Sequence, residues 1–266
     1  MPERITLPIA DIAEESPDVR TLSFTHPLAA EPGQFVMISD LKGDEKPFSL
    51  SDCGGGSFSI TLRRVGPFTR RLFDARRGDL FSIRGAYGSS FFVHSGRVLL
   101  VGGGCAVPPL FFLCRRLLAA GAEPTVVNGA RSADALLFER RFQALPLHQL
   151  TALEDAPEPL TAVDAALRLL QNNRFDALYA AGPEMMLASL ISNCGALDYQ
   201  LLIERYMKCG IGICGSCTLD PLGIRACVEG PVLPRATVEQ LTEFGVYRRN
   251  SSGARVPVNA RRSCEQ

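Results

Sequence analysis

The chain has 266 residues, which is long enough for two compact domains and a small third one. Lysine plus arginine equals aspartate plus glutamate at 28 each, so no overall charge favours nucleic acid or a highly charged partner. The longest uncharged stretch, residues 98–114, is broken by three glycines and a Pro-Pro pair, which favours a buried strand, turn and helix over a membrane span. The first residues carry acids and lack a long apolar run, so we expect no secretory signal and a cytoplasmic location.

Residues 1–95 read as short β segments separated by turns, for example residues 33–39 and 57–63. Gly54-Gly55-Gly56 is typical of a tight connection between two of these strands. This rhythm predicts an antiparallel β-barrel domain.

From residue 96 to residue 203 the rhythm changes to strands that alternate with helices. The expected strands cover residues 97–101, 124–128, 177–181 and 199–203, and the expected helices cover residues 107–120, 161–171 and 184–193. Such alternation predicts an α/β domain with a parallel sheet. We assign residues 204–266 to a small third domain made of a cysteine loop and a tail. Beyond Pro231 the tail is polar and ends in Arg261-Arg262-Ser263-Cys264, so we expect it to cover another part rather than to form a core.

Two segments of the barrel are candidates for binding a phosphate-bearing cofactor with a flat ring. In Lys46-Pro47-Phe48-Ser49 a cation and a hydroxyl flank a stiff extended pair, although an ordinary strand entry has the same pattern. Thr61-Leu62-Arg63 lies on the next expected strand, and Gly66-Pro67-Phe68-Thr69 opens a helix. The amides at a helix start suit a diphosphate.

Two glycine turns follow expected strands of the α/β domain. Gly102-Gly103-Gly104 connects a strand to a helix, and Gly182-Pro183 does the same further along the chain. The carboxyl ends of parallel strands share one edge of the sheet, where nucleotides bind. The first turn lacks the G-x-G-x-x-G pattern, so a plain strand-to-helix turn remains an alternative.

The most specific pattern is a set of four cysteines, Cys209, Cys214, Cys217 and Cys227. The first three have the C-x4-C-x2-C spacing of plant-type [2Fe–2S] ligation. The glycines between them let the backbone wrap tightly around a cluster. A structural zinc site is the main alternative, and a disulfide framework is disfavoured by the odd total of nine cysteines.

The other chemistry-bearing residues carry no such pattern. Cys53, Cys105, Cys114 and Cys194 lie in or beside apolar segments, so we expect buried thiols. His26, His94 and His148 show no triad or metal pattern, so we expect ordinary structural or surface roles.

Together these motifs resemble the ferredoxin–NADP reductase superfamily. More narrowly, residues 204–212 and 227–232 are similar to the electron-transfer subunits of dihydroorotate dehydrogenase B. The resemblance implies FAD on the barrel, an NAD site on the α/β domain and a [2Fe–2S] cluster on the four cysteines. It implies FAD contacts from Lys46, Pro47, Phe48, Ser49, Thr61, Leu62, Arg63, Phe68 and Thr69.

The resemblance also implies a partner. That partner is an FMN-containing dihydroorotate dehydrogenase catalytic subunit, in a heterotetramer with two copies of each chain, acting in pyrimidine (UMP) biosynthesis. Electrons would pass from FMN through the cluster and FAD to NAD⁺. Lys46, Ala106 and Ala181 depart from residues common in the family, namely arginine, glycine and cysteine. Two other functions remain open: the reductase subunit of a hydrogenase, sulfur-reducing or NADPH–ferredoxin complex, and a zinc-stapled interaction protein without catalysis.

Overall fold

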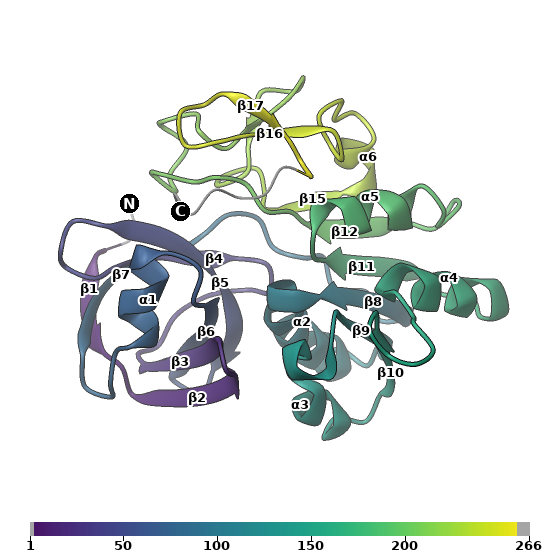
Figure 1. Cartoon of the computed structure of the whole chain (residues 1–266), viewed down its shortest axis with the longest axis horizontal. Coiled ribbons are helices and arrows are strands. Elements are labelled where there is room, and N and C mark those ends of the chain that lie inside the picture. Colours follow the sequence, from purple (N-terminus) through teal and green to yellow (C-terminus); the bar gives the residue numbers. More distant parts are fainter. Residues whose placement is uncertain (1–2, 260–266) are drawn as a thin grey trace.

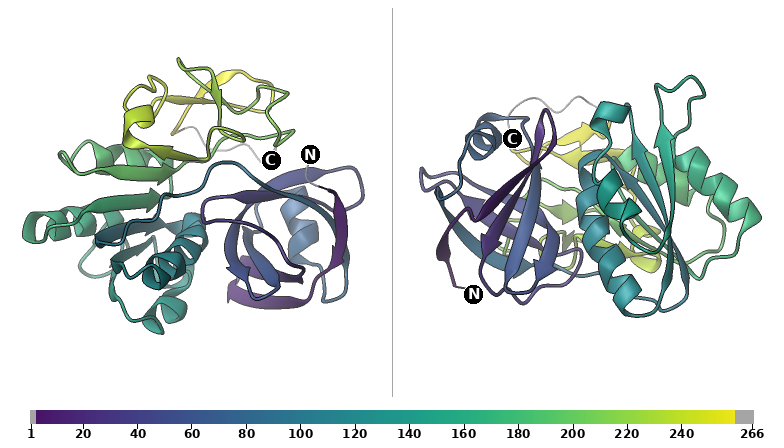
Figure 2. Two further views of the ribbon diagram at one scale, coloured as in Figure 1. Left: turned by 180° about the vertical axis from the view of Figure 1, so that it is seen from behind. Right: turned by 90° about the horizontal axis from the view of Figure 1, so that it is seen from below.

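The structure is a computed structural model that describes residues 3–259. A curled β-sheet lies on one side and a flat sheet flanked by helices on the other (Figure 1). The segment that carries the four cysteines and the last hairpin packs against both. Views from behind and from below show the curled sheet and the α/β part side by side, with the third part bridging them (Figure 2).

The curled sheet has seven strands, all paired antiparallel, in the order β1-β7-β4-β5-β6-β3-β2. Buried side chains of β3, β5 and β6 fill its inner face, as expected for a half-barrel that alternates inward and outward residues. The antiparallel barrel predicted from the sequence is confirmed as this curled half-barrel. Its elements are β1 Ile5–Pro8, β2 Asp11–Ser16, β3 Val19–Thr25, β4 Phe35–Ser39, β5 Glu45–Gly54, β6 Ser57–Arg63, α1 Pro67–Phe73 and β7 Leu80–Tyr87.

The second sheet has six strands in the order β10-β9-β8-β11-β12-β15, and its first five strands are parallel. β8 and β11 are buried almost throughout, since helices cover both faces of the sheet. The predicted parallel sheet is confirmed, whereas β10 and α3 were not predicted. The elements are β8 Arg97–Gly103, η1 Gly104–Ala106, α2 Val107–Ala119, β9 Glu123–Ala130, η2 Ala133–Ala135, α3 Glu139–Gln143, β10 His148–Leu153, α4 Ala162–Asn172, β11 Ala177–Ala181, α5 Glu184–Ile191 and β12 Tyr199–Leu202.

The strand order reverses between β8 and β11. From β8 the chain moves outward to β9 and β10, and it then returns to the other side of β8 to form β11 and β12. Such a switch point opens a crevice at the carboxyl ends of the two strands, and ligands of open α/β sheets bind there.

The tail contributes to the core, so the prediction that it does not was wrong. β15, Val232–Pro234, pairs antiparallel with β12, and Val232 and Leu233 are buried. Without β15 the backbone of β12 would present an open edge. The other elements of this part are β13 Thr218–Leu219, β14 Ile224–Arg225, α6 Arg235–Val238, β16 Tyr247–Arg249 and β17 Arg255–Pro257. The predicted basic end of the tail, residues 261–264, lies outside the described residues.

The half-barrel and the α/β part share a packed joint at α2. Phe112 of this helix is 1% exposed and belongs to the hydrophobic core of the half-barrel. Arg115 on the same helix forms an ion pair with Asp52 of β5. The joint is therefore a continuous apolar contact with a polar margin. Within residues 3–259, no helix is long and apolar enough to cross a membrane.

We predict that Phe112→Ala lowers the free energy of unfolding by about 3–5 kcal/mol, since it leaves a cavity in the joint. Chemical denaturation measures this loss. Phe92→Ala is the matched control, because the Phe92 side chain is 68% exposed, and we expect a change within about 0.5 kcal/mol. Equal losses in the two variants would contradict a shared core.

Candidate cofactor-binding site

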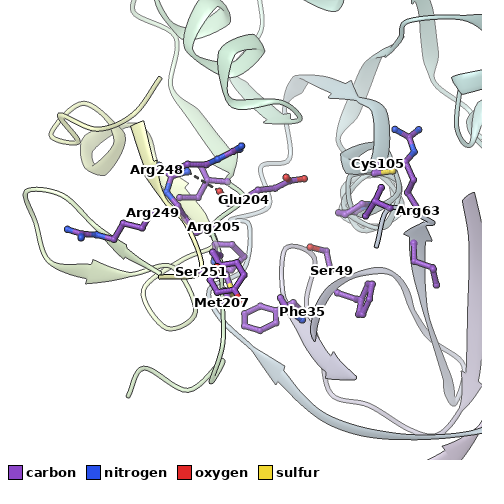
Figure 3. Close-up of a pocket in the computed structure, with 18 of the residues that line it drawn as sticks. Phe35, Ser49, Arg63, Cys105, Glu204, Arg205, Met207, Arg248, Arg249 and Ser251 are labelled. Atoms are coloured by element: carbon purple, nitrogen blue, oxygen red, sulfur yellow. Dashed lines mark hydrogen bonds between the residues drawn. The ribbon is translucent and has the colours of Figure 1, made fainter. Parts of the chain in front are cut away.

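A cavity of about 500 Å³ lies where the three parts meet (Figure 3). That volume falls within the range of small-molecule sites. Its walls come from β4 to β6, from the start of α2, from residues 203–207 and from the β16–β17 hairpin. The lining residues include Phe35, Pro47, Phe48, Ser49, Thr61, Leu62, Arg63, Val65, Cys105, Pro109, Ile203, Glu204, Arg205, Tyr206, Met207, Arg248, Arg249, Asn250, Ser251 and Val256.

The structure brings the predicted barrel segments together in this cavity. Residues 47–49 on β5 and 61–63 on β6 both line it. The Phe48 ring stacks on Phe68 of α1 with ring centroids 6.2 Å apart, so Phe68 supports the cavity wall from behind. The Thr61 hydroxyl lies 2.8 Å from the Thr21 hydroxyl, which fixes its rotamer. Contacts with neighbouring side chains therefore support this wall from behind.

Four of the predicted barrel residues do not line the cavity, namely Lys46, Gly66, Phe68 and Thr69. The ammonium of Lys46 lies over the Tyr206 ring, 5.6 Å from its centroid, and Lys46 is not part of the lining. The Thr69 hydroxyl accepts hydrogen bonds from the amides of Val65 and Gly66 at 3.0 and 2.9 Å. Thr69 therefore stabilises the start of α1, beside the cavity rather than in its lining.

The two glycine turns of the α/β part meet at the switch point. β8 and β11 are neighbours, and Ala181 pairs with Gly102 in register. A Cβ atom on Gly103 would approach Pro183 to 3.2 Å and the sulfur of Met186 to 2.8 Å, so the turns pack too closely for a side chain. Cys105 and Pro109, which follow the first turn, line the large cavity. A second, small pocket touches Gly182, Glu184, Glu204 and Arg248. The crevice of the sheet therefore opens toward the cavity.

The four loop cysteines form two pairs. Cys214 is hydrogen-bonded to Cys209, and Cys217 is hydrogen-bonded to Cys227. The bond from Cys227 lowers the pKa of Cys217, and the same contact raises the pKa of Cys227. Among residues 3–259 no three His, Cys, Asp or Glu side chains gather around the position of a single metal ion. Zinc needs four ligands around one ion, whereas a two-iron cluster takes two thiolates on each iron. Two pairs of thiols fit a [2Fe–2S] cluster.

The backbone of the loop also fits a cluster. The amide of Gly212 donates to the sulfur of Cys227 at 3.2 Å, and the amide of Cys214 donates to the sulfur of Cys209 at 3.5 Å. Such N–H groups offset the negative charge of cluster sulfurs. Gly212 has φ 80°, and a Cβ atom there would lie 2.7 Å from Val228. The turn therefore requires glycine.

The half-barrel holds the beginning of this loop in place. Arg84 of β7 donates to the carbonyl of Cys209 at 2.7 Å, while Glu45 accepts from the same guanidinium. Gly210 lies against Met37 of β4, where a Cβ atom would come within 2.9 Å of the Met37 side chain. Met207, which lines the cavity, precedes Cys209 by two residues, so their Cα atoms are at most about 7 Å apart. The cavity and the thiol loop are therefore neighbours.

Sequence reasoning missed two walls of the cavity. Residues 203–207 adjoin the cysteine motif, and this proximity was the available signal. The hairpin residues 248–251 are far from any motif and reach the cavity only through tertiary folding. Figure 3 shows Arg249 pointing away from the cavity, and its guanidinium binds Asp220 at 2.9 Å.

The remaining thiols follow the prediction with one difference. Cys53, Cys114 and Cys194 are buried, and burial raises the pKa of each. Cys105 is half-buried because it lies in the cavity wall. None of the eight cysteines in the described part of the chain is in a disulfide.

The fold and the site place the chain among ferredoxin reductase-like oxidoreductases. It is similar to the structure of the NADH-dependent reduced ferredoxin-NADP oxidoreductase, with a TM-score of 0.79 and 28% identity over 88% of this chain and 89% of the other. The flavohem-like FAD/NAD binding domain of nitric oxide dioxygenase from Vibrio cholerae has a TM-score of 0.64 and 19% identity, over 76% of this chain and 99% of that one. The second likeness concerns the fold alone.

The sequence comparisons define the family. Residues 204–239 match the model for the iron-sulfur cluster binding domain of dihydroorotate dehydrogenase B. A Methanothermobacter thermautotrophicus protein named "probable dihydroorotate dehydrogenase B (NAD(+)), electron transfer subunit" is 40% identical, over 94% of this chain and 96% of its own. A Methanocaldococcus jannaschii protein of the same name is 35% identical, over 93% and 96%. The chain belongs to the family of dihydroorotate dehydrogenase B electron transfer subunits.

We predict that Gly212→Ala lowers the iron and sulfide content of the anaerobically purified protein, because the methyl group clashes with Val228. Gly223→Ala is the matched control: its φ is 68°, so the backbone strain of about 1 kcal/mol is similar, but nothing lies within 4 Å of the added methyl group. Iron content at the wild-type level in Gly212→Ala would contradict the fit of a cluster to this turn.

Proposed function

We propose that this chain takes electrons from a dihydroorotate dehydrogenase catalytic subunit through a [2Fe–2S] cluster and FAD and delivers them to NAD⁺. The observation that carries the proposal is the continuity between the two sites. Residues 203–207 form one wall of the cavity, and the first cysteine follows two residues later. A nicotinamide exchanges a hydride, a cluster exchanges single electrons, and FAD exchanges both, so adjacent sites let one chain connect the two chemistries.

The cavity is the proposed FAD site. Pro47, Phe48 and Ser49 line the space from β5, and Thr61, Leu62 and Arg63 line it from β6. The ion pair of Arg63 with Asp18 at 3.2 Å orients its guanidinium at the margin. Gly66, Phe68 and Thr69 at the start of α1 support this wall and would lie near the diphosphate. The ammonium of Lys46 lies against Tyr206, so Lys46 would contact a bound FAD only at the edge of the cavity.

The crevice at the switch point is the proposed NAD site. Gly104, where nothing lies within 4 Å of an added Cβ atom, leaves its backbone open to a nucleotide, and α2 begins three residues later. Gly102 and Gly103 let the chain pack closely against Val107 and Met186 beside this turn. Gly182 and Pro183 form the opposite side. Because Cys105 and Pro109 connect this crevice to the cavity, a nicotinamide bound there would reach a flavin ring in the cavity.

The four paired thiols, Cys209, Cys214, Cys217 and Cys227, are the proposed cluster ligands. The short interval between Cys217 and Cys227 is closed by the small β13–β14 hairpin, in which Thr218 pairs with Arg225. The amide of Ala226 donates to the carbonyl of Cys217 at 3.0 Å, which holds the third and fourth ligands together. The short spacing would therefore still allow Cys227 to act as the fourth ligand.

The surface around the thiol loop fits a protein partner. Ile213 is 76% exposed, and Val228 and Leu222 are 42% and 38% exposed. Exposed apolar residues of this kind mark interaction sites when they gather around a functional group. We propose that the FMN-containing catalytic subunit binds here, in a cytoplasmic heterotetramer of two copies of each chain.

A second function is favoured by one observation, the 28% identity and TM-score of 0.79 with the ferredoxin-NADP oxidoreductase. In that case the same sites would serve an NADPH–ferredoxin or a related reductase complex, and the partner would differ. The identity of the protein that co-purifies with the chain separates the two functions. Colour tests the zinc-stapled alternative, because a zinc protein is colourless.

Cys214→Ser is the variant that tests the order of the sites. We predict that it abolishes electron transfer to or from the partner, because a ligand of the proposed cluster is lost, while NADH still reduces the bound flavin. Anaerobic stopped-flow absorbance follows both steps. The matched control Cys194→Ser changes a buried thiol that is not in the loop and should leave the transfer step intact. Unchanged transfer in Cys214→Ser would refute the cluster assignment.

Ile213→Asp tests the proposed partner surface. An apolar residue at the centre of an interface contributes at least about 2 kcal/mol, so we expect the Kd for the catalytic subunit to rise on the order of 30-fold. Leu80→Asp, at a residue that is 54% exposed on the half-barrel, should leave the Kd unchanged. Calorimetry or sedimentation measures both. Equal affinities of the two variants would place the interface elsewhere.

A further inference from the structure

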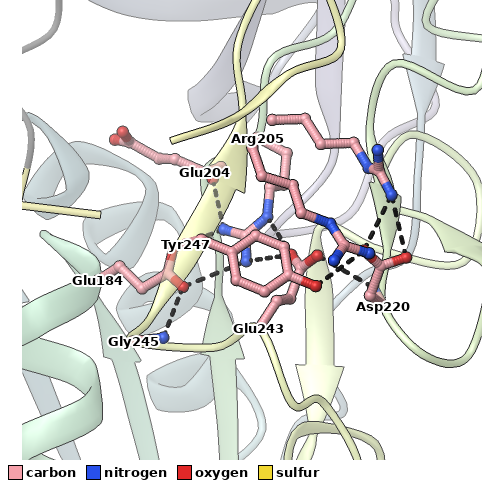
Figure 4. Close-up of polar contacts among 9 residues, drawn as sticks. Glu184, Glu204, Arg205, Asp220, Glu243, Gly245 and Tyr247 are labelled. Atoms are coloured by element: carbon pink, nitrogen blue, oxygen red, sulfur yellow. Dashed lines mark hydrogen bonds and ion pairs between the residues drawn. The ribbon is translucent and has the colours of Figure 1, made fainter. Parts of the chain in front are cut away.

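A buried cluster of three charges lies between the proposed nucleotide crevice and the thiol loop (Figure 4). Arg205 follows Glu204 in the cavity wall, and its side chain is only 2% exposed. Glu184 from the start of α5 and Glu243 from the C-terminal part bind its guanidinium, with side chains 9% and 1% exposed. Three segments that are distant in the sequence therefore meet at one side chain.

Every N–H of the Arg205 guanidinium has an acceptor. Nε donates to Glu243 at 2.9 Å, and Nη2 donates to Glu243 at 2.7 Å and to Glu184 at 3.2 Å. Nη1 donates to Glu184 at 2.5 Å and to the Glu204 carbonyl at 2.9 Å. Arginine has five such donors in a rigid plane, and lysine has three on a flexible stem, so lysine cannot make the same set of bonds.

The two carboxylates that bind Arg205 also accept hydrogen bonds from backbone amides of the C-terminal part. Glu184 directly follows the Gly182-Pro183 turn, and its Oε1 atom also accepts from the amide of Gly245 at 2.8 Å. Glu243 accepts from the amide of Asp220 at 3.0 Å, three residues beyond Cys217. These backbone donors offset the excess negative charge of two buried carboxylates around one guanidinium. The network thus fixes the crevice, the cavity wall and the thiol loop relative to one another.

We propose that Arg205 is a positioning residue that sets the place of the thiol loop relative to the cofactor cavity, and thereby the rate at which electrons pass between them. This inference rests on the proposed function. The half-barrel holds the loop on one side through Arg84, and Arg205 holds it on the other side. Loss of the guanidinium frees residues 204–208, the short stretch of chain that joins the cavity wall at Ile203 to the first cysteine.

Arg205→Lys tests the proposal through two steps in the same molecule. NADH first reduces the flavin, and the reduced flavin then reduces the cluster; anaerobic stopped-flow absorbance resolves the two rates. Electron transfer slows as the separation of the two carriers grows, so a displaced loop affects the second step and not the first. We expect the second rate to fall at least about tenfold and the first to stay within about twofold. A general loss of folding would lower both rates.

Hydrogen exchange supplies a readout that does not depend on activity. In Arg205→Lys we expect faster exchange at the amides of Asp220 and Gly245, since their acceptors lose their fixed position. Arg235→Lys is the matched control, because Arg235 binds Glu239 at 2.7 Å in a more exposed ion pair. We expect neither rate nor those two amides to change in the control.

Glu243→Gln keeps the test decisive if Arg205→Lys fails to fold. It retains the side-chain shape and removes one charge, and we expect its second rate to fall at least about threefold with an unchanged EPR signal of the cluster. Both rates within about twofold of wild type in the folded variants, or equal decreases of both, would overturn the proposal. If the wild-type chain binds no flavin or cluster, the proposed function itself is wrong, which is a separate result.

Discussion

The structure depends on the position of one short segment, residues 203–209. The amide of Ile203 donates to the carbonyl of Pro231 at 3.0 Å, which joins the end of β12 to the strand that completes the sheet. The next residues form a wall of the cavity, and the segment then ends at the first cysteine of the loop. Two electron-carrying sites can work together only if their distance is fixed, and in this chain a few consecutive residues determine it.

The charges around this segment explain how so short a link stays in place. Glu45 and Arg84 hold the carbonyl of Cys209 against the half-barrel, with the Arg84 side chain 13% exposed. Hydrogen bonding to Glu45 raises the pKa of Arg84. A guanidinium is charged at every physiological pH, so this contact does not depend on pH. On the opposite side the buried pairs of Arg205 act in the same way. Removal of one member of a buried ion pair costs about 3–5 kcal/mol, since the other charge is left without a partner.

Much of the fold follows from local sequence, and β11 is the clearest example. Its expected bounds, residues 177–181, coincide with the strand, because a continuous apolar run is flanked by a charged residue and by Gly-Pro. β10 was not predicted, since it lies at the edge of the sheet and its side chains are mostly half-buried, which leaves no clear apolar period. β15 was missed because three residues give no periodicity, and only its pairing with β12 makes it a strand.

In the site, too, some features follow from local sequence and others only from the folded structure. The spacing of the four cysteines is a local property, and the sequence reveals it. Which residues of β5 line the cavity depends on how this strand packs in the curled sheet, where Lys46 pairs with Ile38 of β4. Residues 248–251 line the cavity because of the way the tail folds, and no sequence motif predicts that fold.

The central claim is that electrons from dihydroorotate leave through this chain to NAD⁺. The most direct measurement is an anaerobic assay of the chain together with the protein that co-purifies with it, in which dihydroorotate is added and NADH formation is followed by absorbance. The account predicts a dihydroorotate dehydrogenase catalytic subunit as the partner, and NADH formation that requires both chains. A different oxidoreductase as the stoichiometric partner, with no NADH formed from dihydroorotate, would contradict it.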